Sequence, residues 1–105
     1  MNAKIVKDEH GDDGRSTYEI EATGVALAIE FYPGDPEAGE RPWHADIRFV
    51  VAGEELDGED VNPRAAFLAA ASRHETMVRG GRPMPAVAWS EIEQALEAAG
   101  AFAHG

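Results

Sequence analysis

The most acidic stretch of the sequence is residues 53–60, GEELDGED, in which five of eight residues are acidic and none is basic. Carboxylates are the ligands that Ca²⁺ prefers, and an EF-hand loop also needs Gly at its sixth position. A loop that starts at Gly53 places Gly58 correctly but lacks the first ligand, and later starts misplace the Gly. We therefore interpret the stretch as a solvated acidic turn around Asp57-Gly58, which is a common turn dipeptide.

Histidines stand near carboxylates at two places where a divalent metal ion could bind. His10 is followed by Asp12 and Asp13, and His44 and Asp46 are two residues apart, which points both side chains to one side of a strand. A metal site needs three or four convergent ligands, and the sequence brings no further ligand to either pair. We predict neither a metal nor another cofactor.

His44, Asp46 and Arg48 alternate along one segment and would share one face of a strand with acidic neighbours. Such a group could do acid–base chemistry or bind a ligand if a pocket enclosed it. On an open sheet the same residues are ordinary cross-strand pairs. No serine lies in a GxSxG motif, and the Gly80-Gly81 pair lacks a P-loop frame. The sequence therefore predicts no catalytic residue and a protein that is not an enzyme.

The net charge of −11 belongs entirely to the first part of the chain. Residues 1–60 include sixteen acidic and five basic residues, whereas the remainder has four of each. This charge repels nucleic acids and anionic membranes and attracts basic protein surfaces. The chain has no Cys and no apolar run long enough for a membrane helix or a signal peptide. We expect a cytoplasmic protein that binds neither nucleic acid nor membranes directly; its oligomeric state stays open.

Alternation of apolar and polar residues predicts antiparallel strands in the first half of the chain. They are expected at about residues 3–8, 16–23, 25–32 and 43–52. The strand at residues 43–52 would point Trp43 and Val51 inward. The strand at residues 3–8 has the least regular alternation. Residues 33–42, rich in Pro and Gly, would form a long loop.

The second half predicts two helices. Asn62-Pro63 is a typical helix start, and the first helix should cover about residues 63–79, with Leu68 and Val78 among its buried residues. The second should cover about residues 90–100, capped by Ser90 in the capping box SEIE. Strands followed by helices predict a single α+β domain, residues 1–105: a two-layer sandwich in which three or four strands form a meander and both helices pack on one face.

From fold and charge together we expect a small acidic protein-binding module. It would engage a basic, nucleic-acid-handling partner, as an inhibitor does in the anti-CRISPR, anti-restriction or immunity-protein strategy. Tyr32 and Phe102 are the candidate interface aromatics. The acidic residues expected to contact the partner are Asp8, Glu9, Asp12, Asp13, Glu54, Glu55, Asp57, Glu59 and Asp60.

Two other interpretations stay open. The acidity could serve solubility or salt tolerance in a non-enzymatic accessory protein. A small ligand-binding domain or enzyme could instead use the face of His44, Asp46 and Arg48.

Overall fold

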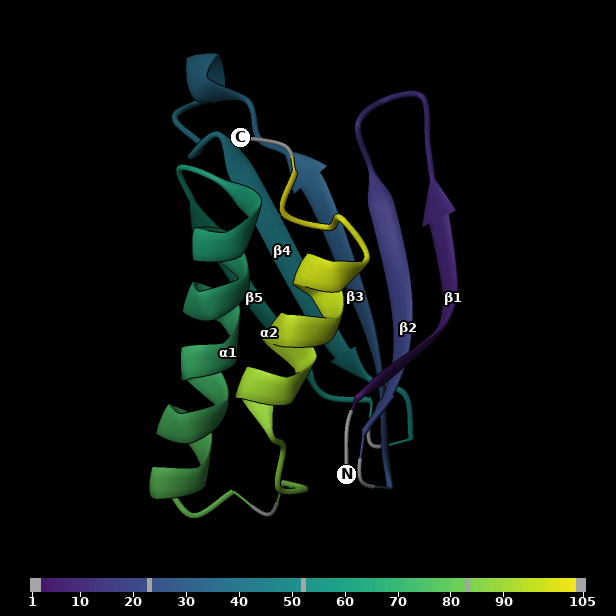
Figure 1. Ribbon diagram of the computed structural model, residues 1–105. Helices are drawn as coiled ribbons and strands as arrows, with labels where there is room; N and C mark the ends of the chain where they lie inside the picture. The colour runs from purple at the N-terminus through teal and green to yellow at the C-terminus, as the bar shows by residue number, and fades with distance from the viewer. Residues whose placement is uncertain (1–2, 23, 52, 83, 104–105) are drawn as a thin grey trace.

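A computed structural model describes residues 3–22, 24–51, 53–82 and 84–103 as an antiparallel sheet followed by two helices (Figure 1). The elements are β1 (Lys4–His10), β2 (Ser16–Ala22), β3 (Val25–Pro33), the 3₁₀ turn η1 (Pro36–Ala38), β4 (Trp43–Phe49), β5 (Glu55–Asp60), α1 (Pro63–Arg79) and α2 (Trp89–Ala98). The strands lie in the order β1-β2-β3-β4-β5, which is a simple meander. The predicted α+β two-layer fold is confirmed, with five strands rather than three or four.

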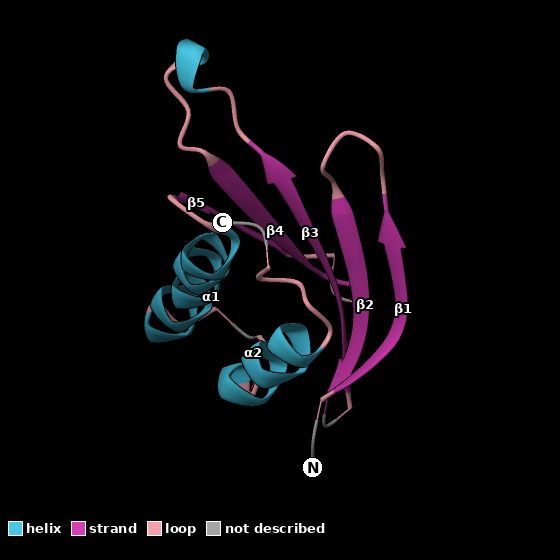
Figure 2. Ribbon diagram, turned by 45° about the horizontal axis from the view of Figure 1, so that its top comes forward, coloured by secondary structure: helices cyan, strands magenta, loops and turns pink. Residues whose placement is uncertain are grey.

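Both helices lie on the same side of the sheet, as Figure 2 shows, and the core fills the space between the two layers. The alternation in β2, β3 and β4 turns their apolar residues toward the helices, as predicted. The largest fully buried side chains of the two layers are Tyr18, Ile20, Leu27, Ile29, Phe31, Ile47, Phe49, Leu56, Phe67, Ile92 and Leu96.

The acidic stretch is not a turn, and this prediction was wrong. Residues 55–60 form the edge strand β5, paired regularly with β4. Leu56 and Gly58 are buried under α1, whereas Glu55, Asp57 and Glu59 are exposed on the opposite side. Packing of the inward pair overrides the low strand propensity of Asp, Glu and Gly.

Two strand boundaries also differ from the prediction. The first strand continues to His10, and β4 ends at Phe49, because residues 50 and 51 belong to the turn before β5. Val51 is therefore 94% exposed instead of inward. The predicted strand ends at Thr23 and Ala52 lie outside the described residues.

Helix α1 begins as the sequence predicts, with the Asn62 side chain accepting a hydrogen bond from the Ala65 amide at 2.8 Å. Its predicted buried face is partly wrong, since Leu68 and Val78 are 44% and 46% exposed. Small residues let this helix approach the sheet closely. Its buried residues are Pro63, Ala66, Phe67, Ala70, Ala71 and His74.

Helix α2 begins at Trp89, and Ser90 is not its cap: Ala88 holds that position without a side-chain hydrogen bond. The Trp89 ring packs on Phe67, and its indole N–H donates to Nδ1 of buried His74 at 3.3 Å. The other His74 nitrogen, Nε2, bonds the Pro85 carbonyl at 2.8 Å. These contacts fix the start of α2 against α1. Neither described helix is long and apolar enough to cross a membrane.

Candidate functional site

We call the sheet face opposite the helices the outer face; no described helix or strand covers it (Figure 2). The strand register arranges its side chains in rows. One row, with one residue from each strand in order, is Glu9, Thr17, Glu30, Asp46 and Asp57. The next row is Lys7, Glu19, Ala28, Arg48 and Glu55. On the other side of the first row, β3 to β5 contribute Tyr32, His44 and Glu59.

Positive charge on the outer face is unevenly distributed. Lys7 of β1 pairs with Glu9 at 3.0 Å, and Arg15 of the β1–β2 loop pairs with Glu30 at 3.2 Å. Asp46 and Asp57 lie directly opposite each other on adjacent strands, which are about 4.8 Å apart. Within the described part of the chain, neither of them takes part in an ion pair. Arg48 of β4 lies directly opposite Glu55, and Arg73 of α1 lies near Asp46 and Asp57. The described ion pairs therefore leave the Asp46–Asp57 pair itself without a bound cation.

The pKa of Asp46 is raised by its burial and by the carboxylates around it. Partial burial raises the pKa of Asp46 above its usual range, and the charges of Asp57 and Glu30 raise it further. These negative neighbours make ionisation of Asp46 less favourable. Ionised Asp46 thus opposes folding, and a nearby cation would relieve the repulsion from Asp57 and Glu30.

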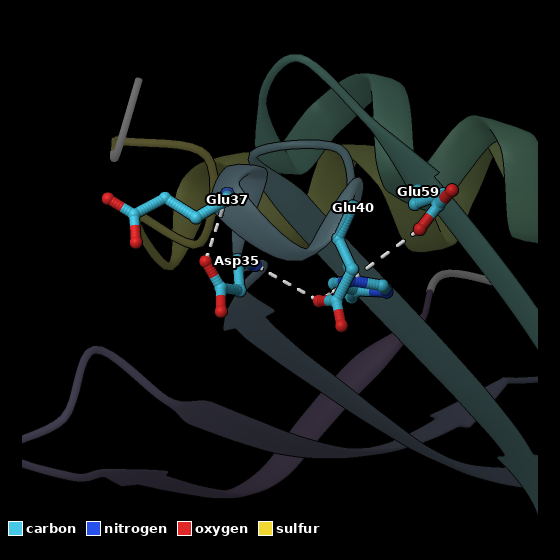
Figure 3. Close-up of polar contacts among 5 residues, drawn as sticks. Asp35, Glu37, Glu40 and Glu59 are labelled. Carbon is cyan, nitrogen blue, oxygen red and sulfur yellow. Dashed lines mark hydrogen bonds and ion pairs between the residues drawn. The ribbon is translucent and has the colours of Figure 1, made fainter.

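Tyr32 and His44 form a stacked pair beside this cluster of carboxylates. Their ring centroids are 4.8 Å apart and their planes differ by 2°, while the Arg15 guanidinium lies 4.7 Å from the centroid of Tyr32. The Nε2 atom of His44 lies 3.0 Å from Glu40 and 3.5 Å from Glu59. Figure 3 shows Glu40 and Glu59 approaching from two separate segments. The stack gives this end of the outer face a rigid aromatic surface.

The loop that carries Glu40 is fixed by its own hydrogen bonds. Asp35 accepts from the Glu37 amide at 3.0 Å, and the Asp35 amide donates to Glu40 at 3.0 Å (Figure 3). This backbone donor, followed by the hydrogen bond with His44, holds the pKa of Glu40 below its usual range. Glu40 is therefore ionised beside His44, which places one more negative charge near the cluster.

We expect the Tyr32 hydroxyl to lose its proton only at an unusually high pH. Burial and the charge of Asp46 raise the pKa of Tyr32 to about 12. Because the folded-state pKa lies above the usual value near 10, the contribution of neutral Tyr32 to stability is present below about pH 10 and is lost as the pH rises through about 12. Replacing Asp46 with Asn should lower the midpoint, measured from phenolate absorbance in a Tyr18→Phe background. An unchanged midpoint would show that Asp46 does not act on Tyr32.

Shallow depressions open on the outer face, and one of them continues past β5 to α1. One of about 420 Å³ is lined by Tyr32, His44, Asp46, Asp57, Gly58, Glu59 and, from α1, Arg73. The other, of about 200 Å³, is lined by Thr17, Ala28, Glu30, Asp46, Arg48 and Glu55. His44, Asp46 and Arg48 do share this face, but the two depressions are open to solvent at their mouths. Among the described residues, no group of three or more potential ligands is arranged to hold a metal ion.

The acidic residues predicted to contact a partner do not form one surface. Asp8, Glu9, Asp12 and Asp13 lie on β1 or the loop after it, and the others lie on β5 or just before it, at the opposite edge of the sheet. Glu54 and Asp60 also have ion-pair partners, Arg82 at 2.7 Å and Arg41 at 3.0 Å. Of the nine predicted contact residues, Glu55, Asp57 and Glu59 are the ones whose carboxylates lie on the outer face of β5. Together with Glu30 and Asp46 they form what we call the acidic cluster.

The two candidate interface aromatics have different surroundings. Tyr32 lies half-buried on the outer face within its stack. Phe102 packs against Phe31 and Phe67 on the core side, with its ring under Arg64. Tyr32 is thus the aromatic that borders the acidic cluster.

The contact residues predicted from sequence omit Glu30 and Asp46, which complete the cluster beside Asp57. Their alternation with apolar residues indicated that they face outward. The position of Asp46 beside Asp57 follows from pairing with β5, a strand that the sequence did not predict.

Comparisons with protein-family models, with curated proteins and with solved structures found no match.

Proposed function

We propose that this protein is a binding module that holds a basic surface of a partner protein against its outer face. The observation that carries the proposal is the row of Glu30, Asp46 and Asp57 on three adjacent strands, on a face that no described helix covers. Opposite charge on a partner would reduce the repulsion within this row. Glu55 and Glu59 flank Asp57 on β5 and extend the same charge.

The expected partner is a basic protein that handles nucleic acid. Surfaces that bind phosphates carry clustered Lys and Arg, and an acidic face can occupy such a surface in place of the nucleic acid. Long-range attraction would speed association, and the Tyr32–His44 stack would add desolvated contact area. Under this proposal the protein is an inhibitor or regulator and acts without catalysis.

The test is affinity capture from an extract of the source cells at low salt, followed by elution in a salt gradient. The baits are the wild type and a variant with Glu55→Lys, Asp57→Lys and Glu59→Lys. All three side chains are exposed, so the variant should fold. We expect a basic protein to be retained by the wild type and to elute from the variant at much lower salt.

The matched control carries Glu37→Lys, Glu75→Lys and Glu97→Lys, three exposed acids outside the outer face. It changes the net charge by the same amount, so it separates the effect of this face from that of total charge. Equal loss of the partner from both variants would contradict a specific role of the outer face. Capture by no bait would favour the interpretation that the acidity serves solubility or salt tolerance.

A further inference from the structure

The two edges of the sheet differ in regularity. Pairing of β1 with β2 shifts register between Ile5 and Lys7, which leaves Val6 as an extra residue in a bulge. Bulges and lysines on an edge strand discourage another strand from pairing with it. By contrast, β5 pairs with β4 over six consecutive residues without a shift and contains no Pro. The β5 edge therefore keeps the regular geometry that an added strand requires.

The register also shows which backbone groups of β5 point to this free edge. Phe49 N–H donates to the Glu54 carbonyl at 2.9 Å, which sets the phase of the antiparallel ladder. In such a ladder, residues alternate between bonding the neighbouring strand and pointing away from it. Leu56 and Gly58 accordingly bond β4, whereas the N–H and C=O groups of Glu55, Asp57 and Glu59 point to the open edge.

The same three residues carry their carboxylates on the outer face, which selects the kind of strand that can pair here. A residue directly opposite each of them would have its side chain on the same face, about 5 Å away. Pairing of two copies through this edge would place Asp57 opposite Asp57 and Glu55 opposite Glu59. Like charges directly opposite one another are destabilising, so a second copy is a poor occupant.

The surface beside this edge has room for an extended chain. The depression of about 420 Å³ reaches from Tyr32 and Asp46, across β5 at Asp57 and Gly58, to Arg73 of α1. An added strand would lie along β5 at this depression, and its basic side chains would reach the Asp46–Asp57 pair.

We infer that β5 is a docking edge for an extended basic segment of the partner, paired antiparallel to β5 with Lys or Arg at every second residue. This deepens the proposed function and rests on it. Backbone hydrogen bonds would supply affinity, and the alternating charges would supply specificity, which is the general mode of strand addition. Residues between the basic ones would turn toward the helix side of the sheet.

The test uses a short blocked peptide with Arg at every second position and Thr or Val between. Two N-methylated forms serve as matched probes with identical charge and mass. Methylation of the Arg residues removes the N–H groups that would bond Glu55, Asp57 and Glu59. Methylation of the Thr and Val residues blocks only N–H groups that point away from β5. Affinity is measured by titration, and amide hydrogen exchange of β5 is followed by NMR.

We expect the form methylated on Thr and Val to bind at least about tenfold more tightly than the form methylated on Arg, since several hydrogen bonds are at stake. The unmethylated peptide should slow amide exchange at Glu55, Asp57 and Glu59. Equal affinity of the two methylated forms would overturn strand pairing and leave charge-driven binding intact. Strand pairing would also be overturned if the protein bound none of the peptides and still captured its partner through the outer face.

Discussion

Replacing Gly58 with Ala is expected to destabilise the protein by about 3 kcal/mol, at the upper end of the usual range for overpacking. A Cβ at this position would lie 2.4 Å from the Ala70 nitrogen and 2.6 Å from the Ala66 oxygen. Both atoms belong to the backbone of α1, so no side-chain rotation can relieve the contact. The helix would have to move away from β5, and Leu56 beside Gly58 would lose packing.

Chemical unfolding of this variant beside Gly80→Ala gives the comparison. At Gly80 the nearest atom to an added Cβ is the Met77 oxygen at 3.4 Å, and φ is −77°, so Ala fits there with little change in stability. Similar unfolding free energies for the two variants would mean that α1 does not contact the β5 backbone. The placement of the acidic strand would then be wrong.

Truncating Phe67 to Ala should destabilise the protein by about 3–5 kcal/mol, because a large buried ring leaves a cavity when it is removed. Phe67 is fully buried and packs against Trp89 and Phe102, which join α1 to α2 and to the chain after it. Its neighbour Leu68 is 44% exposed, so Leu68→Ala should cost much less. Equal effects in denaturant titrations would contradict the orientation of α1.

Much of the fold follows from local patterns. Strict alternation in residues 16–22 predicts β2 and its buried face, and Asn62-Pro63 predicts the start of α1. These predictions are reliable because each sequence pattern lies within a few residues of the element that it specifies.

The errors arise where contacts between residues far apart in the sequence determine the local structure. In β5 only Leu56 is a large apolar residue, and the need for Gly58 comes from the approach of α1, which no local pattern reveals. The start of α2 shifts to Trp89 because that ring packs on Phe67 and His74 from another helix. Tertiary packing here overrides local propensity.

The candidate site was predicted in part. Charge counting correctly placed the excess of acidic residues in the sheet layer, and alternation placed His44 and Asp46 on the outer side. Which carboxylates become neighbours depends on register, which is set by strand pairing across the whole sheet. Asp46 therefore gained Asp57, on the unpredicted strand β5, as a neighbour that the sequence did not reveal.

The central claim is that the outer face binds a basic partner through charge. Its most direct test is the dissociation constant of the captured partner, measured by calorimetry at low and at physiological salt. We predict that the affinity of the wild type and of the Glu37/Glu75/Glu97 control falls at least about tenfold as salt screens the charges, and that the Glu55/Asp57/Glu59 variant binds weakly throughout. An affinity that is independent of salt and unchanged in that variant would contradict the claim.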